Sequence, residues 1–327
     1  MHFRHPLRFH PLFRSYIWGG SRLERDLKKP VPESKAWAES WEIVDHGADQ
    51  SIVAEGPHSG KALKELIELD SQAILGTGVE TATFPLLLKF LDCNRVLSVQ
   101  VHPNDDYAKK MPQPDLGKTE AWYVIDREPG AKVYAGLKVG VTQETLREAI
   151  QTGNCEQWLH VIEPDPGDCI FIPAGTVHAL GAGLLVAEIQ QASDTTFRLF
   201  DWNRVDDQGN PRPLHVDQAL EVTNFDVGPV QAVCPQMVAR GVELLISCPY
   251  FELHRYTAGP HRLMGGDFKI VTVVRGEVVL QDTQEKTWLA LGQTALLPAS
   301  HEESELTLGP DSIALVASLP SSNRGAR

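Results

Sequence analysis

Residues 97–102 constrain the fold more than any other segment of this chain. They read Leu-Ser-Val-Gln-Val-His, with apolar and polar residues alternating at every step. This is the pattern of a β-strand with one apolar face. Ser98, Gln100 and His102 would share the other face, because successive side chains of a strand point to opposite sides. On a helix, Gln100 and His102 would lie about 200° apart. We therefore expect a strand that presents an amide and an imidazole to one place.

Two further segments carry metal-ligating side chains. Glu120 ends a Gly-Lys-Thr-Glu run, and His178 ends a Pro-Ala-Gly-Thr-Val-His run. With Gln100 and His102 they form a mixed nitrogen and oxygen ligand set, which suits a zinc ion with room left for substrate oxygens. The same set would accept iron, manganese or cobalt. A neutral amide is the weakest ligand of the four, so Gln100 either binds the ion or orients a bound water.

The composition limits the partners and the compartment. The chain has 327 residues, enough for one large domain with an appendage or for two domains. Its 30 basic and 43 acidic residues give a net charge of -13, which argues against nucleic acid or a membrane surface as a partner. A local basic cluster still allows a small anionic substrate. Five dispersed cysteines without a C-x-x-C pair indicate reduced thiols, so we expect a cytoplasmic protein.

Short apolar runs separated by Gly, Pro and Asp predict a mostly antiparallel β protein. Two segments have helical spacing, the second with Thr142 as its N-cap: residues 61–67 and 142–150. Residues 85–101 are expected to form two strands joined at the turn-forming cluster 92–94. Residues 121–125 and 131–135 are expected to form a hairpin around 128–130.

The segment that ends at His178 has a spacing of its own. Five residues separate Gly167 from Pro173, and a glycine precedes His178. This spacing resembles the second motif of the cupin superfamily of small β-barrels. Residues 292–298 repeat the Gly-to-Pro spacing, but Glu303 stands where the ligand His would fall. The sequence thus predicts a mostly β fold of two cupin (jelly-roll) barrels with a few short helices, the second barrel without a metal.

A boundary between the barrels is expected between Asp226 and Val242, where Gly228, Pro229 and Pro235 fall. We expect a catalytic cupin domain with helical insertions over 1–235. A second cupin-like domain without a metal site is expected over 236–327.

Six segments in one order resemble the type I phosphomannose isomerases in their shorter bacterial form. They are residues 18–20, 39–42, 85–103, 117–122, 173–178 and 193–198. The resemblance implies a zinc-dependent aldose-ketose isomerase that interconverts mannose 6-phosphate and fructose 6-phosphate through a metal-stabilised cis-enediol. It implies one Zn²⁺ per chain, bound by Gln100, His102, Glu120 and His178. The partner would be a small-molecule sugar phosphate, and the enzyme would be a monomer or a homodimer.

The resemblance also implies site roles for six other residues. Catalytic roles fall on Lys118, Arg198 and Glu188, and substrate contacts on Ser98, Lys89 and Asp194. Longer members of the family have His-Lys-Pro-Glu where this chain has Gly-Lys-Thr-Glu. Proton transfer by that extra His therefore does not apply here.

Several of these roles have alternatives in the residues themselves. Arg198 would hold a phosphate bidentately, stabilise developing negative charge, or form a structural pair with Asp194 or Asp201. Glu188 would be a proton carrier with a raised pKa, or would hold Lys118 or Arg198 in place. A lysine inside an apolar run, as at position 89, is unexpected without a partner.

Two other classes of function compete with the isomerase. A non-catalytic sugar-phosphate-binding cupin would keep the fold without turnover, but Lys118, Arg198 and the complete ligand set argue against it. A cupin oxygenase would use iron. The glutamine in the ligand set and the lack of a His-x-His pair argue against that class.

Overall fold

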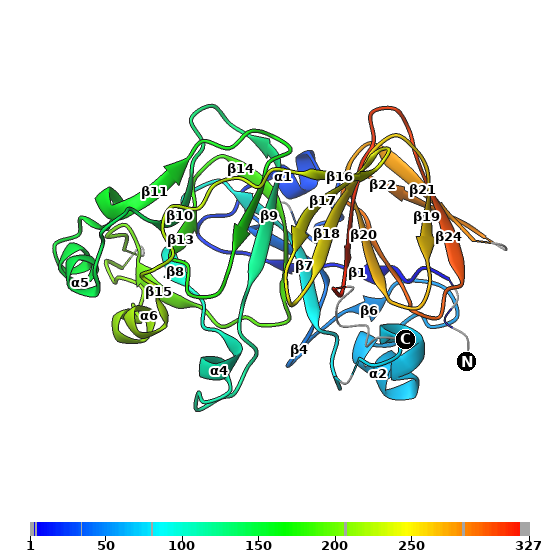
Figure 1. The fold of residues 1–327 in the computed structure, drawn as a ribbon, viewed down its shortest axis with the longest axis horizontal. Coiled ribbons are helices and arrows are strands. Elements are labelled where there is room, and N and C mark those ends of the chain that lie inside the picture. Colours follow the sequence, from blue (N-terminus) through cyan, green and yellow to red (C-terminus); the bar gives the residue numbers. More distant parts are fainter. Residues whose placement is uncertain are drawn as a thin grey trace.

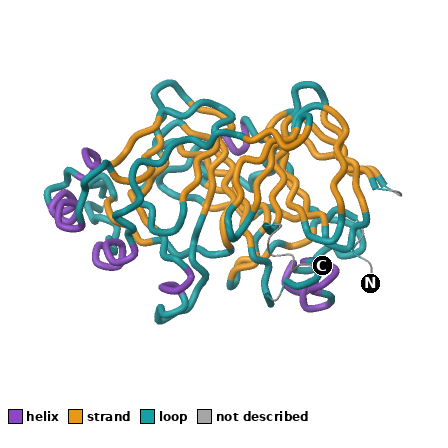
Figure 2. Tube along the Cα trace, viewed as in Figure 1, coloured by secondary structure: helices purple, strands orange, loops and turns teal. Residues whose placement is uncertain are grey.

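Four antiparallel sheets make up most of the protein. The computed structural model describes residues 3, 5–33, 35–79, 81–205, 208–282 and 285–320. All strand ladders in this part of the chain are antiparallel, and most of the short helices lie at the outside (Figure 1, Figure 2). The prediction of a mostly β protein with few short helices is confirmed.

Strands that precede residue 236 form the first two large sheets. The six-stranded sheet, called the central sheet below, has the order β12 (Cys169–Ile172), β9 (Glu120–Arg127), β14 (Leu184–Gln191), β7 (Leu86–Cys93), β3 (Glu39–Ile43) and β2 (Leu12–Arg14). The five-stranded sheet has the order β11 (Leu159–Ile162), β10 (Val133–Leu137), β13 (His178–Leu180), β8 (Val99–Val101) and β15 (Phe197–Phe200). Their apolar side chains meet in one cluster, in which Leu91 and Trp122 of the central sheet join Val133 and Leu180.

Strands from Gln236 onward form the other two large sheets. One has the order β16 (Gln236–Ala239), β17 (Val242–Ser247), β18 (Glu252–Tyr256), β25 (Ile313–Ser318), β20 (Lys269–Arg275) and β23 (Thr294–Leu297). The other has the order β19 (Gly259–Met264), β24 (Glu303–Leu308), β21 (Glu277–Gln281) and β22 (Lys286–Ala290). Two short pairs complete the strands: β1 (Phe9–His10) with β6 (Ile52–Val53), and β4 (Asp45–His46) with β5 (Asp49–Gln50).

The central sheet is covered on both faces. Its second face packs on the sheet of β16 to β23, where Phe90 and Ala187 share a cluster with Leu253 and Ile270. All eight residues of β7 are buried, because a strand covered on both faces exposes neither row of side chains. This explains the almost continuous apolar run of residues 86–91. Polar side chains on this sheet therefore point into protein.

The helices are short and lie outside the sheets (Figure 1). They are α1 (Arg22–Arg25), α2 (Leu63–Leu69), α3 (Ser71–Leu75), α4 (Asp105–Ala108), α5 (Gln143–Gln151) and α6 (Val216–Val222), with a 3₁₀ helix at Cys155–Trp158. The predicted helix over 142–150 is confirmed, and the Thr142 side chain accepts a hydrogen bond from the Thr145 amide. The helix predicted over 61–67 lies two residues later, as α2. No helix in the described residues is long and apolar enough to cross a membrane.

The predicted strand pairs are wrong in one respect. The turn around 128–130 connects β9 to β10, but these strands lie in different sheets and do not form a hairpin. The two strands predicted over residues 85–101 are present as β7 and β8, but Asp92 and Cys93 belong to the end of β7 rather than to the turn. Alternation and turn residues indicate where strands begin and end. They do not specify which sheet each strand joins.

The turn between β22 and β23 docks on the segment that follows α1. Lys29 Nζ lies 2.6 Å from Glu42 Oε2 and donates a hydrogen bond to the carbonyl of Gly292. Gly292 has φ +79°, and a Cβ atom there would lie 2.3 Å from the carbonyl oxygen of Leu27. The hydrogen bond from buried Lys29 to Gly292 and this close backbone approach thus join the two halves of the chain.

We expect Gly292→Ala to lower the free energy of unfolding by about 1–3 kcal/mol more than Gly140→Ala. Gly140 is the matched control, since its φ of +85° is similar but nothing lies within 4 Å of an added Cβ. The difference between the two variants thus isolates the clash with Leu27. Chemical denaturation of both variants measures it. Equal losses of stability in the two variants would show that the backbone at Leu27 moves to accommodate the added Cβ atom.

Candidate metal centre and active site

Three buried side chains from separate segments converge between the first two sheets. His102 follows β8 and His178 begins β13, whereas Glu120 begins β9 in the central sheet. His178 Nε2 lies 3.3 Å from Glu120 Oε1, and His102 Nε2 lies 3.6 Å from Glu120 Oε2. Among the described residues, no other group of three His, Cys, Asp or Glu side chains brings its ligand atoms within 4.8 Å of one another. The structure thus brings together three of the four predicted ligands as one cluster.

The fourth predicted ligand lies beside this cluster. Gln100 on β8 is directly opposite His178 on β13, and on its other side it is opposite Arg198 on β15. Its side chain lines the adjoining cavity. In the sheet, Gln100 thus stands between the histidine and the arginine.

Both imidazoles are oriented by backbone carbonyls. Nδ1 of His102 donates to the carbonyl of Thr195 at 2.9 Å, and Nδ1 of His178 donates to the carbonyl of Thr176 at 2.8 Å. A carbonyl only accepts, so the proton of each neutral ring sits on Nδ1 and the electron pair on Nε2. Burial lowers the pKa of both rings, that of His102 to about 3. Near neutral pH both rings therefore offer an electron pair to a metal.

Glu120 completes a set of buried electron-pair donors. Burial alone would raise its pKa, but the ammonium of Lys118 and the two imidazoles outweigh burial and hold the pKa well below its usual range. Lys118 Nζ lies 2.7 Å from Glu120 Oε2. Yet neither Glu120 oxygen, nor His178 Nε2, has a hydrogen bond within the described residues. Buried polar atoms without partners are costly. A divalent cation between them would satisfy all three.

A row of charged and aromatic side chains crosses four strands of the central sheet. Trp41 on β3 is opposite Lys89 on β7, Lys89 is opposite Glu188 on β14, and Glu188 is opposite Trp122 on β9. Lys89 Nζ lies 3.2 Å from Glu188 Oε1, and the Trp122 indole donates to Glu188 Oε2 at 2.9 Å. The partner that we expected for Lys89 from the sequence is thus a buried carboxylate, that of Glu188.

Glu39 ends this network on the far side of Lys89. Its Oε2 lies 3.6 Å from Lys89 Nζ and accepts a hydrogen bond from the Trp41 indole at 2.6 Å. Burial would lower the pKa of Lys89, but the carboxylates of Glu188 and Glu39 outweigh it and raise that pKa. Burial and the charge of Glu120 raise the pKa of Glu188. Glu39 was not predicted as a site residue, although it lies in one of the six segments that carry the family resemblance.

A cavity of about 250 Å³ opens beside the cluster. All six of the residues given catalytic or substrate roles line it, together with Gln100: Ser98, Lys89, Asp194, Lys118, Glu188 and Arg198. Tyr16, Trp18, Glu39 and Arg212 contribute further walls. The prediction that these residues come together therefore agrees with the geometry, whereas their individual roles stay predictions.

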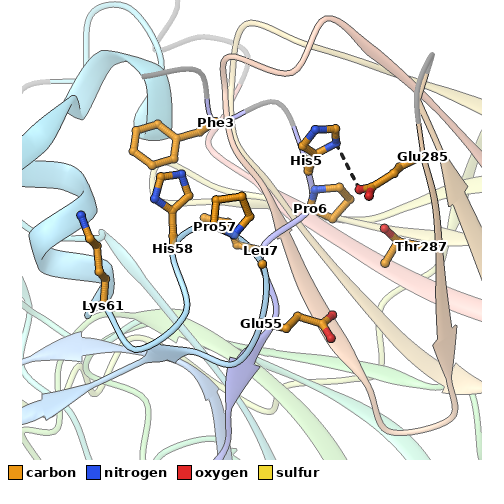
Figure 3. A pocket seen from close by; sticks show the side chains of 11 residues that line it. Phe3, His5, Pro6, Leu7, Glu55, Pro57, His58, Lys61, Glu285 and Thr287 are labelled. Carbon is orange, nitrogen blue, oxygen red and sulfur yellow. Dashed lines mark ion pairs between the residues drawn. The ribbon is translucent and has the colours of Figure 1, made fainter.

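A larger cavity of about 700 Å³ lies elsewhere, between the N-terminal segment, residues 55–61 and β22 (Figure 3). His5 and Glu285 form an ion pair there, with His5 Nδ1 3.4 Å from Glu285 Oε2. None of the predicted site residues lines it, and its charged side chains are all partly or fully exposed. Chemistry rather than size therefore identifies the smaller cavity as the candidate site.

Asp115 orders the loop that holds His102. Its Oδ2 accepts hydrogen bonds from the hydroxyls of Ser193 and Thr195 at 3.0 and 2.7 Å, and its Oδ1 lies 3.1 Å from His46 Nε2. Thr195 in turn provides the carbonyl that fixes His102. Sequence reasoning missed Asp115, because no local pattern connects residue 115 to residues 193–195.

Arg198 is half-buried and does not form the predicted alternative pairs within the described residues. Its Nη1 donates to the carbonyl of Pro213 at 2.8 Å, and its Nε has no hydrogen bond. Asp201 instead pairs with Arg204 and Arg212. Burial, and then the charge of Arg212, lower the pKa of Arg198. The guanidinium of Arg198 is thus available to an anion in the cavity.

Comparisons with known proteins give one consistent answer. Residues 7–128 match the family described as phosphomannose isomerase type I, catalytic domain. Mannose-6-phosphate isomerase ManA of Bacillus subtilis (strain 168) is 37% identical over 83% of this chain and 86% of its own length. A mannose-6-phosphate isomerase of Streptococcus mutans is 35% identical over 90% of this chain and 92% of its own.

The fold agrees with this result. The crystal structure of the mannose 6-phosphate isomerase from Bacillus subtilis superimposes with a TM-score of 0.87 and 32% identity. The match covers 96% of this chain and 99% of that structure. The prediction of the cupin fold is thereby confirmed.

We expect Lys89→Met to lower the free energy of unfolding by about 3–5 kcal/mol at neutral pH. Methionine keeps most of the volume of lysine, but Glu39 and Glu188 then stay buried with one cation fewer. Chemical denaturation measures the loss.

Two controls separate the lost charge from lost packing. Lys64 is exposed, so Lys64→Met should change stability by no more than about 0.5 kcal/mol. The double variant Lys89→Met/Glu39→Gln removes one stranded carboxylate and should regain part of the loss. A Lys89→Met variant as stable as the wild type would contradict this account of the network.

Proposed function

Because this chain belongs to the type I phosphomannose isomerases, we propose that it binds a single zinc ion next to the cavity beside β8 and β9. The enzyme is an aldose-ketose isomerase that interconverts mannose 6-phosphate and fructose 6-phosphate. The proposed zinc ligands are Gln100, His102, Glu120 and His178. One observation carries the proposal: Glu120 Oε1 and His178 Nε2 are buried and lie 3.3 Å apart, and neither forms a hydrogen bond within the described residues.

Zinc would supply a Lewis acid that polarises the sugar carbonyl without exchanging electrons. The two imidazoles and the carboxylate suit it, and iron, manganese or cobalt would also fit this ligand set. Gln100 either binds the ion directly or orients a water beside it. Metal analysis of the purified protein distinguishes the ions.

Glu188 is the proposed proton carrier. The reaction moves a proton between C2 and C1 of the open-chain sugar through a cis-enediol, so the site needs a base. Glu188 lines the cavity, and Trp122 fixes its Oε2, while Oε1 lies 3.2 Å from Lys89 Nζ and accepts no hydrogen bond within the described residues. Burial raises the pKa of this carboxyl group, so it takes up a proton more readily near neutral pH.

Lys118 is the proposed electrostatic partner of the reacting oxygens. Its Nζ lies 3.2 Å from His102 Nε2 and 3.7 Å from Glu188 Oε1, between the ligands and the proposed proton carrier. An ammonium group in this position stabilises negative charge that develops on the sugar oxygens. Its positive charge also weakens the electrostatic repulsion between the carboxylates of Glu188 and Glu120.

Arg198 and three further residues are the proposed contacts of the rest of the substrate. Ser98, Lys89 and Asp194 line the same cavity as Arg198. Arg198 either holds the phosphate or stabilises the charge of the enediol. The kinetic effect of its removal separates these two uses.

We also propose the division into a catalytic domain over 1–235 and a second cupin-like domain without a metal site over 236–327. Strands up to β15 form the first two large sheets, and strands from β16 form the other two, which supports this division. Five free cysteines, four of them buried, support a reducing compartment such as the cytoplasm. The expectation of a monomer or a homodimer stays a prediction.

The direct test is the formation of fructose 6-phosphate from mannose 6-phosphate by the purified protein, with zinc measured on the same sample. We expect turnover and about one zinc per chain. Metal-loaded protein that binds mannose 6-phosphate without converting it would instead identify a sugar-phosphate-binding protein. The isomerase relatives do not favour that alternative.

We predict that His178→Ala loses both zinc and turnover, while Glu303→Ala loses neither. His178 is a proposed ligand, whereas Glu303 is exposed and lies 3.3 Å from Arg262 Nε at the edge of the second barrel. Zinc content and kcat are measured for both variants. Two tightly bound ions per wild-type chain would show that the second barrel has been misread.

Lys118→Met and Arg198→Met should keep their zinc and lose at least about a hundredfold in kcat/KM. Neither residue is a proposed ligand, so their loss acts on the substrate. A raised KM for Arg198→Met would indicate phosphate binding, and a lowered kcat would indicate stabilisation of the enediol. The exposed Lys64→Met is the control. Near-normal kcat/KM in both variants would remove these residues from the site.

A further inference from the structure

One aspartate holds two arginines at one end of the cavity, and a third arginine lies beside them. Asp201 is buried, and Arg212 contacts it through two parallel hydrogen bonds, Nε to Oδ2 at 2.7 Å and Nη2 to Oδ1 at 2.5 Å. Arg204 also pairs with Asp201 and donates from Nη1 to the carbonyl of Val96 at 2.6 Å. This arrangement fixes the planar guanidinium of Arg212 in one orientation.

The two arginines that pair with Asp201 differ in whether they line the cavity. Arg212 lines the cavity and Arg204 does not. The Nε edge of Arg212 is used by Asp201, but its Nη1 donates no hydrogen bond within the described residues. Arg198 donates to the carbonyl of Pro213, the residue next to Arg212. Two guanidiniums therefore lie side by side on one wall, each with unused donors.

Strand register places this wall beside Ser98. On β15, Arg198 is opposite Gln100 and Phe200 is opposite Val99 of the antiparallel β8. The chain after Phe200 consequently runs past Ser98, and the Trp202 indole donates to the carbonyl of Leu97 at 2.6 Å. Asp201, which holds Arg204 and Arg212, thus lies toward the Ser98 end of β8, whereas Arg198 is opposite Gln100 and His102 follows the other end.

Carboxylates outnumber ammonium groups on one side of the cavity, whereas positive charge is in excess at this wall. Lys89 and Lys118 face Glu39, Glu188 and Glu120. Asp194 acts on Lys89 and Tyr16 on that same side. At the other end, Asp201 is the one carboxylate paired with the arginines among the described residues. In a chain with a net charge of -13, this local excess of positive charge marks a place for an anion.

We propose that Arg212 binds the phosphate group of the substrate, with its Nη1 and Nη2 donors directed at the phosphate oxygens. The proposal rests on the proposed function, which supplies the sugar phosphate. Arg212 thereby sets the specificity for a phosphorylated sugar, and Asp201 holds its guanidinium in place. Arg204 is an anchor that ties Asp201 to residue 96 and does not touch the substrate.

The test compares Arg212→Met with Arg204→Met. Each variant removes one guanidinium from Asp201, but one guanidinium lines the cavity and the other does not. Inorganic phosphate is titrated into metal-stripped protein, with the fluorescence of Trp18 and Trp122 in the cavity wall as the signal. The KM and kcat for mannose 6-phosphate are measured on the zinc-loaded proteins.

We expect Arg212→Met to raise the dissociation constant of phosphate and the KM by about tenfold to a hundredfold, with kcat within about threefold of the wild type. Arg204→Met should leave both constants within about twofold. Arg212→Lys keeps the positive charge but lacks the paired donors of a guanidinium. Its dissociation constant for phosphate and its KM should therefore lie between those of the wild type and Arg212→Met. Thermal unfolding shows that each variant is folded.

Three results would overturn the assignment. They are an unchanged phosphate affinity in Arg212→Met, an equal loss in Arg204→Met, and a loss confined to kcat. Failure of the proposed function looks different, since the wild type would then not convert mannose 6-phosphate. The phosphate titration does not depend on turnover and still decides whether Arg212 binds the anion.

Discussion

The burial of the central sheet on both faces is the constraint on which the rest of the structure depends. One face packs on the sheet of β16 to β23 through apolar side chains, and the other face carries Glu39, Lys89 and Glu188 into the cavity wall and Glu120 into the metal-ligand cluster. Because little water reaches these charges, each must have an opposite charge or a fixed donor beside it. The result is an alternating series of carboxylates and ammonium groups, with two indoles that hold the carboxylates in place.

This series ends at Glu120, where the pairing is incomplete. Lys118 is close to one oxygen, but neither oxygen accepts a hydrogen bond within the described residues, and the two imidazoles turn their electron pairs toward the same carboxylate. A fully paired network would serve stability alone. Here the hydrogen bonding is incomplete at one point, among side chains that are common metal ligands. This feature distinguishes a candidate metal site from a buried ion-pair network.

The sequence predicted the parts of the site that depend on short spacing. Gln100 and His102 follow from strand alternation, and the need for a partner at Lys89 follows from the apolar run around it. Glu39, Asp115 and Arg212 were missed, because each acts through a contact with a residue far away in the chain. The hairpin error around 128–130 has the same origin: turn residues mark a connection, but sheet membership depends on long-range pairing. The family resemblance supplied what spacing alone did not.

The central claim is that a single zinc ion binds at Gln100, His102, Glu120 and His178. A titration of metal-free protein with zinc tests it most directly, with the rate of fructose 6-phosphate formation measured after each addition. The account predicts that activity is absent at the start, rises in proportion to added zinc, and stops rising at about one equivalent per chain. Full activity before any zinc is added, or a rise that continues to two equivalents, would contradict it.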